Sequence, residues 1–120
     1  MSTLRVNTLQ DTAGVERFTA RAWVNFNGTG TVAIRGSGNV SSITDHSAGN
    51  YTINMTTAMP DANYAVTGTA SEDSSDSRSV SLGFDNLFLT PTTTAFRINT
   101  RNFGTSTDVD CDYVFVSVFR

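Results

Sequence analysis

The segment 22–40, AWVNFNGTGTVAIRGSGNV, carries the clearest sign of the fold class, because apolar and polar residues alternate along two runs on either side of a glycine turn. The first run puts apolar side chains on one face of an extended strand, namely Ala22, Val24 and Phe26. Asn27 and Gly28 follow, and both residue types accept the positive φ of a tight hairpin turn. The second run, residues 31–35, alternates again, and GSGN at 36–39 predicts another turn. The segment therefore predicts a β-hairpin.

The same two-residue period recurs in the rest of the chain, and no segment has a convincing helical period. Alternating runs occupy residues 51–56, 64–69, 79–84, 86–91 and 95–100. Turn residues such as Pro60 and Asp61 separate them. About eight strands in so short a chain are typical of an all-β sandwich or jelly roll. We therefore expect a single antiparallel β-sandwich, jelly-roll-like, over residues 20–120.

The N-terminal residues 1–19 have weak periodicity and no hydrophobic face of their own. We interpret them as an extended arm or connecting segment. Leu4, Val6 and Leu9 have no evident partner within so short a segment, so we expect them to pack against a neighbouring copy of the chain.

The last segment, DVDCDYVFVSVFR at 108–120, predicts one long strand that is apolar on both faces in its second half. Such a strand is either central in its sheet or packed against another chain on one face. A single sandwich has one core, so a second apolar face is left for a partner. We expect an interface with other copies of the chain that uses Val114, Val116 and Val118.

Composition and charge exclude several classes of protein. The 120 residues fit one domain, and the net charge of −3 supplies no basic face for nucleic acid. No apolar run is long enough to span a bilayer, and the first residues lack the order of a signal peptide. With one cysteine the chain has no internal disulfide, which suits synthesis in a reducing cytoplasm.

Candidate catalytic groups are few, so we expect neither an enzyme nor a cofactor. His46 is the only histidine and lies among small polar residues, which is typical of a solvated turn. Cys111 lies between Asp110 and Asp112, whose negative charges make a thiol a poorer nucleophile. Its simpler interpretation is a small buried apolar residue.

Three aspartates, Asp108, Asp110 and Asp112, would project from one face of the predicted last strand. Their carboxylate oxygens make them a candidate Ca²⁺ site. The alternative is a solvated strand end whose charges discourage edge pairing. We therefore predict no metal site. The three aspartates are the candidate ligands should the chain bind a metal ion.

Two loops and one tryptophan are candidates for contact with a partner. Residues 71–78, SEDSSDSR, read as a polar surface loop, whereas Phe103 stands between Arg101, Asn102 and a glycine. An aromatic ring beside hydrogen-bonding residues is a common way to hold a sugar or a protein surface. Trp23, on the polar face of its strand, is a further candidate. Both rings have the alternative of packing, Phe103 on the core and Trp23 beneath a neighbouring subunit.

Residues 20–45, ARAWVNFNGTGTVAIRGSGNVSSITD, followed by GNYTINMTTAMPDANYAVTG at 49–68, resemble a module of tailed-phage virion proteins. That module recurs at the ends of tail fibres and related appendages, notably in phages of aquatic bacteria. STLRVNTLQDTAG at 2–14 looks like the segment that often precedes it. The resemblance covers residues 2–68, and beyond them only the strand pattern agrees. It implies a trimeric, non-enzymatic, β-rich structural or adhesive protein.

The resemblance leads to an ordered set of functional expectations. The first is a tail-fibre or receptor-binding module of a bacteriophage virion, made in the host cytoplasm. Its partners would be other virion proteins and a host surface glycan or protein. Fibre proteins usually have a long shaft before the module, whereas here only residues 1–19 precede it. We therefore expect a short tip subunit or a small trimer on the capsid. The alternatives are a capsid decoration protein (cement or head fibre), a carbohydrate-binding module and, last, a small hydrolase.

Overall fold

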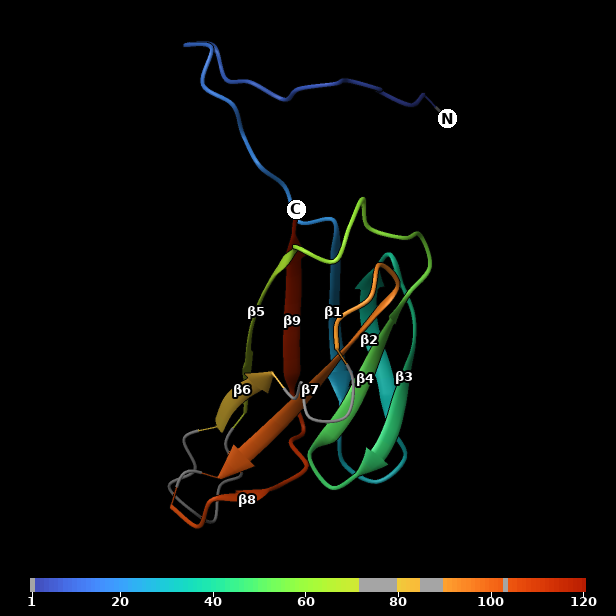
Figure 1. Cartoon of the computed structure of the whole chain (residues 1–120), viewed down its shortest axis with the longest axis vertical. Coiled ribbons are helices and arrows are strands. Elements are labelled where there is room, and N and C mark those ends of the chain that lie inside the picture. The colour runs from blue at the N-terminus through green and yellow to red at the C-terminus, as the bar shows by residue number, and fades with distance from the viewer. Residues whose placement is uncertain (1, 72–79, 85–89, 103) are drawn as a thin grey trace.

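Two antiparallel sheets pack face to face in the computed structural model, which describes residues 2–71, 80–84, 90–102 and 104–120 (Figure 1). The first sheet has the order β2 (Ala33–Gly38), β1 (Ala22–Asn27), β9 (Val114–Phe119) and β5 (Ala65–Ala70). The second has the order β3 (Val40–Ser47), β4 (Asn50–Met55), β7 (Ala95–Asn102) and β6 (Val80–Phe84), and β8 (Thr107–Asp108) pairs with β7. The predicted all-β sandwich is confirmed.

The core lies between the sheets and consists of the apolar faces that the alternation predicts. Strand β1 buries Ala22, Val24 and Phe26, and strand β4 buries Tyr51, Ile53 and Met55. The remaining buried apolar side chains are Val40, Met59, Phe96, Ile98, Cys111, Val114, Val116 and Val118. The rings of Phe26 and Tyr51 meet edge to face with centroids 5.2 Å apart, a favourable geometry for an aromatic pair across the two sheets.

The β1–β2 hairpin forms as predicted, but its turn is longer than the two residues Asn27 and Gly28. Five residues, 28–32, separate the strands, and the positive φ falls on Gly30, at 59°. Asn27 instead acts through its side chain, because Asn27 Oδ1 accepts hydrogen bonds from Thr29 N (2.9 Å) and Thr29 Oγ1 (2.7 Å). A side-chain turn of this kind replaces the tight backbone turn.

The predicted second turn, GSGN, is mostly strand. Gly36 and Gly38 belong to β2, and Asn39 alone carries the chain from the first sheet to the second, with φ 55°. Asn39 Nδ2 donates to the carbonyl oxygens of Arg21 (3.2 Å) and Thr57 (3.0 Å), and Asn39 Oδ1 accepts from Thr57 N (2.6 Å). An asparagine tolerates this conformation and its amide satisfies three backbone groups at the corner.

The last strand begins at Val114, not at Asp108, so the prediction of one strand from Asp108 onward is wrong. Residues 109–113 cross from β8 in the second sheet to β9 in the first. Hydrogen bonds to both sheets hold this crossing, because Val109 N donates to Thr100 O (2.9 Å) and Cys111 O accepts from Gly28 N (2.8 Å).

A buried tyrosine joins the two sheets at this crossing. The fully buried Tyr51 hydroxyl lies 2.6 Å from Asp110 Oδ1 and 3.0 Å from the Gly28 carbonyl oxygen. Asp110 Oδ1 also accepts from Gly49 N at 2.7 Å. Burial, followed by the hydrogen bond to the Asp110 carboxylate, raises the pKa of Tyr51 above its ordinary value, so the phenol stays protonated and available as a donor.

The arm lies outside the sandwich, and its apolar side chains are exposed in the single chain (Figure 1). A small turn forms within it, where Asp11 Oδ1 accepts from Ala13 N and Val15 N and its carboxylate pairs with Arg17.

At the other end of the chain, Arg120 donates two hydrogen bonds to Asp61 and holds the pKa of that carboxyl at about 2. Among the described residues, no helix is long and apolar enough to cross a membrane.

Tyr51→Phe tests the buried link between the sheets. The change leaves Asp110 Oδ1 and the Gly28 carbonyl without their hydroxyl donor, so we expect the free energy of unfolding to fall by about 1–3 kcal/mol. Urea denaturation measures this fall. Tyr113→Phe removes the hydroxyl of an exposed tyrosine and is the matched control, with an expected change near zero. Equal stability of the two variants would contradict the role given to Tyr51.

Candidate functional site

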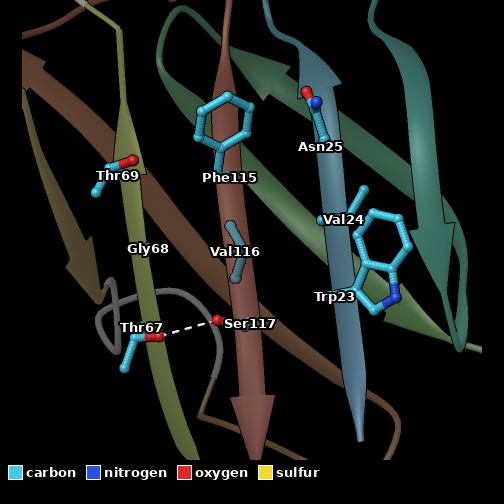
Figure 2. A pocket seen from close by; sticks show the side chains of 9 residues that line it. All are labelled: Trp23, Val24, Asn25, Thr67, Gly68, Thr69, Phe115, Val116 and Ser117. Carbon is cyan, nitrogen blue, oxygen red and sulfur yellow. Dashed lines mark hydrogen bonds between the residues drawn. The ribbon is translucent and has the colours of Figure 1, made fainter. Parts of the chain in front are cut away.

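The outer face of the β2–β1–β9–β5 sheet has an open groove of about 580 Å³. Strands β1, β9 and β5 line it with Trp23, Val24, Asn25, Thr67, Gly68, Thr69, Phe115, Val116 and Ser117 (Figure 2). Antiparallel register places Ser117 between Trp23 and Thr67 in one row across the strands. The next row contains Asn25, Phe115 and Thr69. The groove therefore combines two aromatic rings with three hydroxyl groups and one amide.

Trp23 lies flat against the sheet because β2 has glycine where it passes beneath the indole. A Cβ atom at Gly38 would lie 2.8 Å from Trp23 Cδ1, and one at Gly36 would lie 3.2 Å from Trp23 Cη2. No side chain fits between ring and strand at Gly38, whereas a Cβ atom at Gly36 would make only a tight contact with the ring. The indole is still 46% exposed, so one ring face is covered by β2 and the other faces solvent.

The polar groups of the groove are close to one another. Thr67 Oγ1 and Ser117 Oγ are 3.0 Å apart and share one hydrogen bond, drawn as a dashed line in Figure 2. Asn25 Oδ1, in the neighbouring row, is buried and has no hydrogen-bond partner among the described residues. A hydroxyl group can donate and accept together, so Thr67 and Ser117 keep capacity for a ligand.

Aromatic surface continues from the groove along β9. The rings of Tyr113 and Phe115 are tilted with centroids 6.0 Å apart, and the Arg35 guanidinium lies 3.9 Å from the Tyr113 ring centre. Arg35 Nη1 also donates to the Asp112 carbonyl oxygen at 2.6 Å. A guanidinium over a ring is a favourable contact, and here it fixes Tyr113 at the border of the groove.

Strand β9 is central in its sheet, and its two faces differ from the predicted assignment. Val114, Val116 and Val118 are at most 3% exposed and belong to the core, so their side chains are covered within one chain. This corrects the choice of these valines as an oligomer interface. The apolar side chains that β9 leaves open are on the other face, where Phe115 is 44% exposed and Phe119 lies nearby. A homotrimer stays a prediction.

The loop candidates lie on the other sheet from Trp23. Arg101, on β7, is exposed, and its Nε donates to Asp108 Oδ1 at 2.8 Å. Asn102 is buried and accepts a hydrogen bond from Gly104 N at 2.8 Å, which gives its amide a structural role in the turn. Phe103 and most of the acidic loop 71–78 lie outside the described residues.

The candidate metal ligands do not come together. Asp108 pairs with Arg101, Asp110 is engaged by Tyr51 and Gly49, and Asp112 accepts from Thr29 Oγ1 at 3.1 Å. Within the described ranges, no three His, Cys, Asp or Glu side chains could hold a metal ion. The expected period of two fails because residues 109–113 are a crossing and not a strand.

The two candidate catalytic groups from the sequence are His46 and Cys111, and both have structural contacts. His46 Nε2 lies 2.8 Å from Thr52 Oγ1, and Cys111 is buried in the core. Cys111 fits its simpler interpretation as a small buried apolar residue. His46 is exposed as expected, but it belongs to strand β3 and the predicted turn at this residue is wrong.

Comparison with known proteins gives no relative: no family model, no curated protein and no solved structure matches the chain. Apart from Trp23 and Val116, the groove residues were not candidates from the sequence. Thr67, Phe115 and Ser117 belong to strands whose register brings them beside Trp23. The available sign is the pair of glycines at 36 and 38, which the sequence alone assigns to a turn.

Val116 and Phe115 are adjacent in sequence and face opposite sides of the sheet, so they form a matched test of the corrected assignment. Val116→Asp places a charge in the core, and we expect it to abolish folding. Phe115→Asp changes only the outer face, and we expect the melting temperature to stay within a few degrees of the parent protein. Circular dichroism during heating measures both. The opposite order of stability would contradict the assignment.

Proposed function

We propose that this chain is a non-catalytic structural and adhesive module of a tailed-phage virion, at a tail-fibre tip, and that the outer face of the β2–β1–β9–β5 sheet contacts its partner. The observation that carries the adhesive part is the exposure of Trp23, Phe115 and Tyr113 on one rigid sheet face. Aromatic side chains are enriched where proteins bind partners. The virion part rests on the resemblance of residues 2–68.

The form of the domain supports this proposal. A sandwich with its apolar core between two sheets is a durable scaffold, and an interaction face on strands is held more precisely than one on loops. None of the nine residues that line the groove, all of them described, has an ionisable side chain. General acid–base chemistry in the groove would need such a group within hydrogen-bond reach, which favours binding over catalysis there.

The homotrimer is part of the same proposal, with the arm as its contact. Leu4, Val6 and Leu9 are 82%, 56% and 45% exposed in the single chain, and Phe18 is exposed as well. Several apolar side chains on one extended segment favour burial against neighbouring copies. Using the arm for assembly leaves the outer sheet face of each copy free for a host surface.

Immunogold electron microscopy tests the location. An antibody raised against the purified chain is applied to virions of the phage that encodes it. We expect gold at the tail tips. Gold on the capsid would replace the tail-tip proposal with the second candidate, a capsid decoration protein. Virions without gold, alongside a labelled control for a known coat protein, would contradict a virion role.

Light scattering with size exclusion tests the trimer and the arm. We expect a mass of about three chains for the parent protein. Substitution of Leu4, Val6 and Leu9 by Asp puts charges where the contact would be buried, so we expect the mass of a single chain. The matched control changes Thr3, Asn7 and Thr8 to Asp, which adds the same charge at exposed polar positions. A single-chain mass for the parent protein, or dissociation of both variants alike, would refute the arm as the contact.

A further inference from the structure

We propose that the groove beside Trp23 is a subsite for one neutral hexopyranose unit of a surface glycan, stacked on the free face of the indole. This inference deepens the proposed adhesive function and rests on it for the source of the glycan. The ligand chemistry itself follows from the groove.

The first step is the fixed orientation of the indole. Gly36 and Gly38 let the ring lie flat on β2, so one face is packed and the other is presented to solvent. A pyranose ring has one side made largely of C–H groups, and such a side packs well on a flat aromatic ring.

The second step is the placement of hydrogen-bonding groups beside the indole, where the next unit of a glycan stacked on it would lie. Trp23, Ser117 and Thr67 stand in one row on three neighbouring strands. Strands are about 4.8 Å apart, so the Thr67 backbone lies about 10 Å across the sheet from the Trp23 backbone, with Ser117 between them. The indole extends in the other direction, over β2. A hexopyranose that lies over the indole therefore does not reach Thr67 itself, and the next unit of the glycan would meet the Ser117 and Thr67 hydroxyls. Phe115, in the next row, borders this space on the same strand as Ser117.

The third step is the charge of the groove. Its lining residues supply two aromatic rings, hydroxyl groups and the Asn25 amide, but no carboxylate, guanidinium or amine. An anionic sugar or a phosphate would be expected to meet a basic side chain, and none lines this space. A neutral sugar, whose hydroxyl groups both donate and accept, is the complementary ligand.

The chain has a single tryptophan, so its fluorescence reports on this site alone. The probes are neutral tetrasaccharides of glucose, galactose, mannose and N-acetylglucosamine, added to the intact protein up to millimolar concentration. With at least one probe we expect a saturable blue shift and weaker quenching by acrylamide, because the stacked ring excludes water from the indole. Sorbitol, an acyclic polyol with no ring to stack, is the control and should have no saturable effect.

Three variants separate binding from folding. Gly38→Ala forces the indole off its seat while Trp23 is kept, so we expect about a tenfold loss of affinity or more. Thr67→Val keeps the shape and removes one hydroxyl, with an expected loss of about fivefold. The matched control is Thr44→Val, an exposed threonine of β3 on the other sheet, which should bind as the parent protein does. Circular dichroism establishes that each variant is folded.

The outcomes are distinct for this inference and for the proposed function. Absence of any saturable effect with all four probes would overturn the hexopyranose subsite, even if gold labels the virion. Sugar binding by a protein absent from virions would keep the subsite and overturn the virion role. If the indole is protected from acrylamide before sugar is added, and this protection is lost on dilution to single chains, a second copy covers the face and the subsite is refuted.

Discussion

The hydrogen bond between the buried Tyr51 hydroxyl and the Asp110 carboxylate is the constraint on which the described structure depends. It ties β4, in the second sheet, to the crossing that leads into β9 of the first sheet. Gly28 and Gly49 meet at the same point, and both must be glycine. A Cβ atom at Gly28 would lie 2.5 Å from the Tyr51 hydroxyl, and Gly49 combines φ 65° with 2.5 Å between such an atom and the Thr100 carbonyl oxygen. The contact between Tyr51 and Asp110 thus holds three connections together at one end of the sandwich. They are the turn after β1, the turn before β4 and the crossing into β9.

The position of that crossing decides what β9 can present. Because the chain enters β9 only at Val114, the valines alternate into the core and Phe115 and Ser117 alternate outward. A shift by one residue would exchange the faces, burying the aromatic residues and exposing the valines. The Asp110 carboxylate, in the crossing, accepts hydrogen bonds from Gly49 N and the Tyr51 hydroxyl. The same register that fills the core therefore also assembles the groove beside Trp23.

Local alternation made the fold class and the inner faces of β1 and β4 predictable. Successive side chains of a strand point to opposite faces of the sheet, so an alternating pattern leaves only two possible assignments of those faces. Two features were beyond this reasoning. In the sequence, Asp110 continues the two-residue period of its neighbours. In the structure it lies in the crossing between β8 and β9, where it accepts hydrogen bonds from Gly49 and Tyr51. Thr67 and Ser117 are 50 residues apart, and only the pairing of β5 with β9 brings them together. Long-range register is set by the whole core and is not written in any one segment.

The glycines at 36 and 38 show how a local sign acquires its meaning from tertiary context. In isolation, GSGN indicates a turn, because glycine is favoured wherever the backbone bends. In the sheet, neither glycine has a positive φ, and the bend falls on Asn39. What the two positions have in common is the ring above them, which would collide with a side chain at Gly38. A glycine costs strand stability, and here that cost leaves an aromatic face that is both fixed and open. The indole covers the backbone that the two glycines leave bare on this edge strand, so the ring and the glycines compensate for one another.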